Sequence, residues 1–309
     1  MTIQQLQYII ALDNHRHFVR AADSCHVTQP TLTLQIQKLE KEIGVLIFDR
    51  SAHPIKPTPI GEKFINKSRQ IVREIEGLKD MVNSDKYQLT GTFHIGVIPT
   101  LAPYLLPLFV KDFSESHPDI TLKIKEVQSE GIITGVTNGT LDIGIMATPL
   151  QEGQLREIPL YYEPFFVYVH PQHGLFEKET LRPDDIKEKG LWLLDKGHCF
   201  RNQVLNICQH EHLLQSERIA FDTGSIETLK NLIQNYTGYT LVPEMAVQHP
   251  ADTPYIKRFE EPQPAREISL VVHNSFTKEQ LLHNLRKSIL AGIPNHFEKN
   301  KEFVRVKWR

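Results

Sequence analysis

The sequence is poor in three features that would narrow its class at once: cysteine, long apolar runs and net charge. It has three cysteines in 309 residues, an odd number that argues against a secreted disulfide framework and fits a reducing cytosol. No apolar run approaches the length of a membrane span, and the first residues lead straight into a helical pattern, so we expect neither a transmembrane segment nor a signal peptide. The net charge is −2, so a nucleic-acid partner has to be argued from a local motif.

Two of the cysteines lie in one short segment, residues 195–208. The pattern predicts a buried strand over residues 191–194, a turn, and a helix whose first turn carries His198, Cys199 and Arg201. Unpaired amide dipoles at a helix start, and any nearby cation, acidify a thiol there, and the thiolate is the reactive form. In an unbroken helix Cys208 would lie about 13.5 Å further along the axis and about half a turn around it. A disulfide needs α-carbons about 4.4 to 6.8 Å apart, so this pair could close only if the segment refolded, as in a redox switch.

Two other interpretations of these cysteines stay open at this point. Buried cysteines are often small apolar fillers of a core. Cys199, Cys208, His210 and His212 are also good zinc ligands, but structural zinc sites favour cysteines two to four residues apart.

The first 50 residues predict a small helical domain with a helix-turn-helix. Apolar residues at helical spacing predict a first helix, small residues in a second helix allow close packing, and Thr28 caps a third helix with Pro30 in its first turn. Leu32, Ile36 and Leu39 face inward, whereas the outer face is rich in amides and hydroxyls that can bond to base edges in a major groove. The alternative is a plain helical domain with a solvated polar face. The outward residues are Gln29, Thr31, Thr33, Gln35 and Lys38.

A long helix begins at Thr58-Pro59, a cap followed by proline at the first position. Its apolar residues recur at roughly heptad spacing over about three heptads, which predicts a coiled-coil dimerisation seam. A helix packed on its own domain is the alternative, but no adjacent segment is expected to supply a partner. The seam residues are Phe64, Ile71, Ile75, Leu78 and Val82.

After residue 91 the pattern alternates between strand and helix, which predicts a mostly parallel sheet with helices on both faces. Expected strands cover residues 93–98, 120–127, 141–147, 164–170, 218–221, 239–242 and 267–273, and expected helices cover 101–116, 131–138, 225–235 and 278–291. The last strand and helix should return to the first set, giving two lobes with a cleft between them, where ligands collect. Residues 297–309 are basic with interleaved apolar residues, and we expect a surface extension or disordered tail.

The amino-terminal pattern closely resembles the DNA-binding domain of LysR-type transcriptional regulators. The resemblance implies a winged helix-turn-helix over residues 1–58, with the wing at 48–57, a linker and dimerisation helix over 59–88, and a two-lobed α/β domain like a periplasmic binding protein over 89–309. Lobe I would comprise residues 89–161 and 268–309, and lobe II residues 162–267. Thr28 stands where the family usually has serine, and Cys25 in the turn is interpreted as structural. The residues that carry the resemblance are Ala21, Ala22, Thr28, Gln29, Pro30, Thr31, Leu32, Gln35, Ile36, Leu39, Glu40, Leu46, Phe48, Arg50 and Thr58. The implied DNA-binding residues are Arg20, Thr28, Gln29, Pro30, Thr31, Thr33, Gln35, Lys38, Arg50 and Lys56.

Within that family the regulatory region resembles the hydrogen-peroxide-sensing members. By this resemblance Cys199 is the thiol that peroxide oxidises and Cys208 the resolving thiol. Thr100, Ser129 and His198 would line the peroxide pocket, and Arg266 would favour the thiolate. Ser129 stands where these members usually have threonine, but the hydroxyl is kept. The residues that carry the resemblance are Ile98, Pro99, Thr100, Pro103, Tyr104, Leu105, Leu106, Pro107, Gly197, His198, Cys199, Phe200, Arg201, Cys208, Ser225, Glu227, Thr228, Leu229 and Arg266.

The resemblance implies a cytoplasmic transcriptional activator of oxidative-stress genes that is not an enzyme and needs no metal or cofactor. Its expected partners are promoter DNA, RNA polymerase, hydrogen peroxide, a thiol reductant such as glutaredoxin or thioredoxin, and further copies of itself in a homodimer or homotetramer. Two alternatives remain: a LysR-type regulator that binds a small organic effector between the lobes, and a thiol peroxidase fused to a DNA-binding module.

Overall fold

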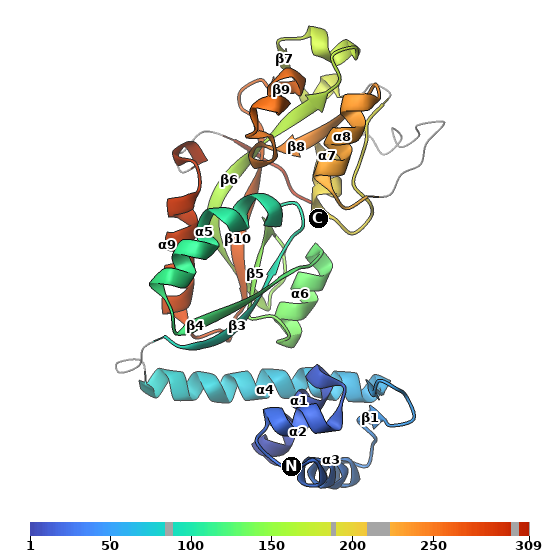
Figure 1. The fold of residues 1–309 in the computed structure, drawn as a ribbon, viewed down its shortest axis with the longest axis vertical. Coiled ribbons are helices and arrows are strands. Elements are labelled where there is room, and N and C mark those ends of the chain that lie inside the picture. The colour runs from blue at the N-terminus through green and yellow to red at the C-terminus, as the bar shows by residue number, and fades with distance from the viewer. Residues whose placement is uncertain (84–88, 187–189, 209–222, 298–302, 309) are drawn as a thin grey trace. The chain divides into compact units, whose positions relative to one another are not determined.

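A computed structural model of the chain describes residues 1–83, 89–186, 190–208, 223–297 and 303–308 (Figure 1). The chain divides into two compact units. The first comprises Met1–Gln88 with two short segments, Asn138–Thr140 and Ser275–Thr277, and the second comprises the rest.

The first unit contains the expected three short helices, a small hairpin and a long helix. Thr28 accepts a hydrogen bond from the Thr31 amide at the start of the third helix, and the Thr58 hydroxyl accepts one from the Gly61 amide at 3.0 Å at the start of the long helix. Both predicted caps are therefore confirmed, because each hydroxyl satisfies an amide that has no partner within its helix. The elements are α1 Ile3–His15, α2 Phe18–Ser24, α3 Gln29–Ile43, β1 Phe48–Asp49, β2 Lys56–Pro57 and α4 Pro59–Asn83.

The core of this unit lies between the inner faces of α1, α2 and α3. Leu32, Ile36 and Leu39 of α3 are completely buried, as predicted, and Ala21 and Ala22 of α2 let the helices approach closely. β1 and β2 pair antiparallel and form the predicted wing. The winged helix-turn-helix is confirmed.

The expectation that no adjacent segment would supply a partner for α4 is wrong. Phe64 and Ile71 pack against the core of the helix-turn-helix, and Arg69 donates to Asp13 at the end of α1 at 2.8 Å. These two apolar residues therefore already pack within their own chain, because α1 lies along α4. Of the remaining predicted seam residues, Ile75 is half-buried and Leu78 is 59% exposed, and the side chain of Val82 lies outside those described.

The second unit is built on a sheet whose described strands run in the order β4-β3-β5-β10-β6-β9-β7, with β8 beside β6 and β11 beside β10. β3 pairs in parallel with β4 and β5, whereas β10 pairs antiparallel with β5 and β6, and β6 pairs antiparallel with β8 and β9. The prediction of a mostly parallel sheet is therefore wrong. The strands are β3 Gly91–Val97, β4 Ile120–Glu126, β5 Ile143–Thr148, β6 Leu155–Val169, β7 Thr180–Leu181, β8 Tyr239–Pro243, β9 Ile256–Phe259, β10 Pro264–His273 and β11 Val304–Arg305.

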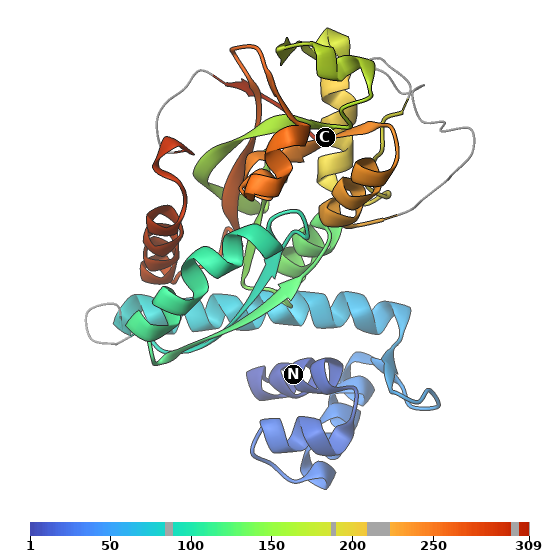
Figure 2. The same ribbon diagram turned by 45° about the horizontal axis from the view of Figure 1, so that its top comes forward.

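β6 and β10 explain this difference. The chain leaves the β3–β4–β5 region along β6 and returns along β10, so the two strands run in opposite directions beside each other (Figures 1 and 2). β6 is one continuous strand that begins nine residues before the expected strand at residue 164. Both predicted lobe boundaries, 161/162 and 267/268, fall inside these strands.

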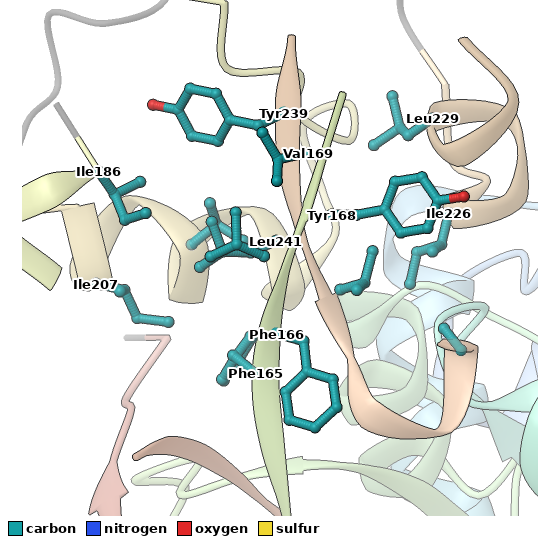
Figure 3. Close-up of a cluster of buried hydrophobic side chains, with 14 of the residues drawn as sticks. Phe165, Phe166, Tyr168, Val169, Ile186, Ile207, Ile226, Leu229, Tyr239 and Leu241 are labelled. Atoms are coloured by element: carbon teal, nitrogen blue, oxygen red, sulfur yellow. The ribbon is translucent and has the colours of Figure 1, made fainter. Parts of the chain in front are cut away.

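Helices cover the sheet and bury its apolar side chains. One core surrounds the end of β6, where Tyr168 lies on the side of Ile226 and Leu229, and Ile207 lies on the other side of the strand (Figure 3). The α-helices of this unit are α5 Ala102–Ser116, α6 Ser129–Asn138, α7 Cys199–Cys208, α8 Ile226–Asn235 and α9 Glu279–Gly292.

Two further expectations in this unit are wrong. Residues 191–194 form no strand; Leu191 makes one isolated bridge to Tyr239, and Trp192 donates a backbone hydrogen bond to the Tyr239 carbonyl at 2.8 Å. Residues 303–308 form neither a surface extension nor a disordered tail, because Val306 and Trp308 are buried and β11 joins the sheet. The strand expected over residues 218–221 lies outside the described residues.

Candidate functional site

Cys199 is the first residue of α7, and the turn before it fixes its position. Gly197 has φ +103°, a conformation that L side chains rarely adopt, and a Cβ there would lie 2.6 Å from Oε1 of Gln128. The Gln128 carbonyl accepts the first helical hydrogen bond of α6, so the glycine allows this turn to pack closely against the start of α6. His198 lies in the same contact, with Nε2 3.4 Å from Gln128 Nε2.

Both thiols of the pair are free and buried, with Cys199 2% and Cys208 1% exposed. α7 begins at one and ends at the other without a break. At 1.5 Å per residue the two lie about 13.5 Å apart along the axis, well beyond the roughly 4.4 to 6.8 Å between α-carbons that a disulfide needs. The geometric condition set by the sequence is therefore met: the pair can be joined only if α7 unwinds.

The four predicted pocket residues come from separate parts of this unit. Thr100 follows β3, Ser129 begins α6, His198 precedes α7 and Arg266 lies in β10, and all four are buried. Arg266 donates from Nη1 to the Thr100 hydroxyl at 2.9 Å and from Nη2 to the Thr100 carbonyl at 3.1 Å. Its guanidinium also lies over the ring of Phe200, 5.3 Å from the centroid, so Arg266 joins Thr100 to the first turn of α7.

The hydroxyl of Ser129 is buried and interacts with the Cys199 thiol. Its Oγ is buried and has no hydrogen-bond partner that meets normal geometry in the described structure. A buried hydroxyl without a partner is unfavourable. Its interaction with the Cys199 sulfur lowers the pKa of that thiol, so this hydroxyl stabilises the thiolate.

Glu163 completes the site, and the sequence reasoning missed it. Its Oε2 accepts from Arg266 Nε at 2.9 Å and lies 2.8 Å from Arg266 Nη2, both side chains are fully buried, and its Oε1 accepts from the Met245 amide at 3.1 Å. Burial raises the pKa of Glu163, and the charge of Arg266 opposes that rise. The sequence does contain a signal for it, because Glu163 is an acidic residue among aromatic residues in an apolar run. An acid buried in such a run seldom lacks a partner of opposite charge or a hydrogen bond.

The electrostatics of Cys199 differ from the expectation of an acidified thiol. Burial raises its pKa, and this effect outweighs the Ser129 hydroxyl, the Arg266 charge and the amides of Phe200 and Cys199, which all lower it. Burial likewise raises the pKa of Cys208, to about 12. The pKa of His198 is lowered by burial despite Asp195 Oδ1 at 3.0 Å from its Nε2, so this imidazole is neutral at pH 7 and adds no positive charge.

The candidate DNA-binding residues form the outer side of the helix-turn-helix. Most are exposed, whereas Thr33, Gln35 and Arg50 are half-buried. Gln35 accepts a hydrogen bond from Gln5 at 3.2 Å. The exposed members are Arg20, Thr28, Gln29, Pro30, Thr31, Lys38 and Lys56.

Arg50 has a structural contact in addition to its expected role at the phosphate backbone. It donates to Glu40 at 2.6 Å, and the other oxygen of this carboxylate accepts from the Ile47 and Phe48 amides. Arg50 therefore neutralises a buried acid that ties the wing to α3, and sequence reasoning missed Glu40 as its partner.

Neither a metal cluster nor a membrane helix is found among the described residues. No group of three or more potential metal ligands lies together there, and His210 and His212 of the zinc alternative lie outside the described residues. No described helix is long and apolar enough to cross a membrane.

Comparison with known proteins agrees with this architecture. Residues 3–62 match the bacterial regulatory helix-turn-helix protein family, lysR family, and residues 86–292 match the LysR substrate binding domain. The chain is 34% identical over 301 residues to the DNA-binding transcriptional dual regulator OxyR of Escherichia coli K12, covering 97% of this chain and 98% of that protein. It is 34% identical over 273 residues to the hydrogen peroxide-inducible genes activator of Haemophilus influenzae, covering 88% and 90%.

Solved structures of this group have the same fold. A full-length mutant of OxyR from Pseudomonas aeruginosa superposes with a TM-score of 0.82 at 32% identity, covering 94% of each chain. A hydrogen-peroxide-bound mutant of OxyR from Corynebacterium glutamicum superposes with a TM-score of 0.62 at 27% identity, covering 94% of this chain and 92% of that one. With both halves matched and with close relatives over nearly its whole length, this chain belongs to the LysR family of bacterial transcriptional regulators.

Proposed function

We propose that this chain is a hydrogen-peroxide-sensing transcriptional activator of oxidative-stress genes, switched by a reversible disulfide between Cys199 and Cys208. The observation that carries the proposal is the placement of two free, buried cysteines at the two ends of one helix. Similarity to regulators named for hydrogen peroxide supports the nature of the signal.

Peroxide would enter beside Cys199, where Thr100, Ser129 and His198 supply polar atoms and Arg266 supplies positive charge. The thiolate attacks one oxygen of hydrogen peroxide, the O–O bond breaks, and the products are a sulfenic acid and hydroxide. The sulfur of Cys208 then displaces the sulfenic oxygen as water and forms the disulfide. One peroxide is consumed per subunit and the thiols return only through a reductant such as glutaredoxin or thioredoxin, so the protein acts as a stoichiometric switch and not as an enzyme.

The signal would reach DNA through a change of subunit arrangement. We assign residues 1–58 to DNA binding, 59–88 to dimerisation and 89–309 to sensing, with residues 162–267 as lobe II. Leu78, which is largely exposed on α4, and the half-buried Ile75 are the seam residues best placed for a second subunit. Unwinding of α7 would alter the packing of the sensing domains, and with it the spacing of two half-sites on promoter DNA and the contact with RNA polymerase. Because its target is promoter DNA in a bacterium, we place the protein in the cytoplasm, as a homodimer or homotetramer.

Mass spectrometry after brief hydrogen peroxide treatment, paired with footprinting on promoter DNA, tests the proposal. We expect a peptide linked through Cys199 and Cys208, a changed footprint, and reversal of both by dithiothreitol. The Cys25→Ser variant is the matched control, because it removes the remaining cysteine and should leave both results unchanged. Recovery of only free thiols, or a footprint that oxidation does not change, would exclude the mechanism.

The match to a substrate binding domain favours one second candidate, a regulator that responds to a small organic effector. In that case Cys199→Ser would keep inducible DNA binding. Sustained peroxide consumption in the presence of thioredoxin would instead indicate a thiol peroxidase.

A further inference from the structure

The end of the chain forms a strap, residues 304–308, that begins on the strand carrying Arg266. Val304 and Arg305 pair in parallel with Pro264 and Ala265 of β10. Backbone amides of Val304 and Val306 donate to the carbonyls of Gln263 and Ala265 at 3.0 and 2.9 Å. The Arg305 guanidinium lies 2.6 Å from the Glu267 carboxylate. This end of the strap is therefore fixed to the sheet.

The other end of the strap lies along α7, the helix that carries both cysteines. Asn202 donates to the Trp308 carbonyl at 3.2 Å, Gln203 to the Val306 carbonyl at 3.1 Å and Asn206 to the Lys307 carbonyl at 2.7 Å.

Apolar contacts reinforce these bonds. Val306 belongs to the same core as Ile207 and Cys208, and Trp308 is 4% exposed. Three consecutive strap carbonyls thus receive hydrogen bonds from side chains on one face of α7, because positions 202, 203 and 206 are neighbours on a helix surface.

We propose that Asn202, Gln203 and Asn206 are positioning residues that clamp α7 to the strap and thereby set how fast the disulfide closes. The inference rests on the proposed function, because it concerns the second step of that reaction. The three residues lie between the two cysteines, so the helix cannot unwind to bring Cys208 to Cys199 while all three side chains keep their partners on a strap fixed to β10.

The clamp should affect one chemical step and not the other. Peroxide oxidises Cys199 inside its pocket with α7 intact, and none of the three residues contributes to that pocket. Closure, in which Cys208 displaces water from the sulfenic sulfur, waits for the helix to open. A clamp therefore retards closure and leaves sulfenic acid formation unchanged, whereas general damage to the fold would alter both.

The test is the double variant Asn202→Ala with Asn206→Ala in the full chain. Stopped-flow oxidation with hydrogen peroxide, with dimedone trapping and mass spectrometry, measures the rates of sulfenic acid formation and of disulfide closure separately. We expect closure to accelerate about threefold to fivefold, from two lost hydrogen bonds partly offset by the better helix propensity of alanine. The two effects have opposite signs, which makes the test more decisive. If the strap hydrogen bonds did not matter, the higher helix propensity of alanine would stabilise α7 and slow closure.

Asn235→Ala is the matched control, because it removes an asparagine bond to a backbone carbonyl within α8, away from the strap. Closure in that variant should match the wild type. Unchanged or slower closure in the double variant overturns the clamp while the disulfide of the wild type still stands. Failure of the wild type to form any disulfide overturns the proposed function itself.

Digestion with carboxypeptidase supplies an independent measurement that does not depend on the variant folding well. Trp308 should be released faster from peroxide-treated protein than from reduced protein, because opening α7 removes the partners of the strap. In Cys208→Ser, which cannot form this disulfide, peroxide should leave release slow. Equal release from reduced and oxidised wild type would overturn the inference.

Discussion

Replacing Arg266 by methionine tests whether the buried ion pair beneath Cys199 serves stability or chemistry. Both Arg266 and Glu163 have no exposed side-chain surface, so the single substitution leaves a carboxylate buried without its cation. Removing one partner of a buried pair typically costs about 3 to 5 kcal/mol. We expect a loss of that size in the free energy of unfolding of this unit.

The loss should depend on pH in a defined direction. Burial raises the pKa of Glu163 even with Arg266 present, and without Arg266 the opposing effect is gone. A carboxyl group with a raised pKa in the folded state binds its proton more tightly there than in the unfolded chain, so stability falls as pH rises through the mildly acidic range. The destabilisation of Arg266→Met should therefore be smaller at pH 5 than at pH 8.

The double variant Arg266→Met with Glu163→Gln separates the two roles. Glutamine can still accept from the Met245 amide, and neither charge of the pair remains buried. The two Thr100 acceptors lose their donor and Phe200 loses its cation. We expect the double variant to recover to within about 1 to 2 kcal/mol of the wild type. The double variant should still react with peroxide more slowly than the wild type. Its rate should be lower by on the order of tenfold for each unit by which the pKa of Cys199 rises.

Urea unfolding followed by tryptophan fluorescence is a suitable assay, because both tryptophans, Trp192 and Trp308, lie in the second unit. Stopped-flow oxidation gives the reaction rate on the same samples. If the double variant were as unstable as Arg266→Met, an uncompensated charge would not be the cause. If it reacted with peroxide at the wild-type rate, Arg266 would have no electrostatic role at Cys199.

Three further outcomes follow from the geometry. The rate of Cys199 oxidation should increase with pH through the neutral and mildly alkaline range, since burial raises the pKa of this thiol and only the thiolate reacts. A stopped-flow pH series measures this, and a rate that did not change with pH would contradict the buried site. Gly197→Ala should lower the stability of the second unit by about 1 to 3 kcal/mol in urea unfolding, because φ is +103° and Gln128 lies in the way, whereas Gly153→Ala, with open space around it, should be nearly neutral. Leu78→Lys should weaken self-association measured by sedimentation, with Leu108→Lys on α5 as the control; equal association of both variants would remove Leu78 from the dimer contact.

Local signals predicted the elements that carry the site. The hydroxyls of Thr28 and Thr58 marked two helix starts because capping depends on a few neighbouring residues. The local pattern predicted a helix start at Cys199, and the structure has an unbroken helix with Cys199 and Cys208 as its ends. The resemblance to a known family supplied the predicted pocket residues, which sequence spacing alone could not bring together because they come from separate elements.

What the sequence did not predict depends on contacts between distant residues. Glu163 and Arg266 are 103 positions apart, and neither residue's neighbours indicate the other. The strap was misjudged because its basic composition is typical of a surface extension, while its burial depends on β10 and α7. The antiparallel β6 and β10 were missed because strand direction follows from where the chain travels, and apolar runs do not record it.

The two ends of α7 are held unequally, and this difference indicates how the switch moves. At the Cys199 end, the Phe200 ring lies under the Arg266 guanidinium, which is hydrogen-bonded to Thr100 and to Glu163. Gly197 packs closely against Gln128 at the same end. Opening that end would take Phe200 away from the Arg266 guanidinium, a cation–π contact worth about 2 kcal/mol when it is desolvated, and would disturb the close packing of Gly197 on Gln128. The Cys208 end is held by apolar packing of Ile207 and by neutral hydrogen bonds to the strap, each worth about 1 kcal/mol. The weaker end should yield, so Cys208 travels to a Cys199 that stays in place. The apolar side chains that leave the core with Cys208 make the oxidised packing a distinct state instead of a small distortion of the reduced one.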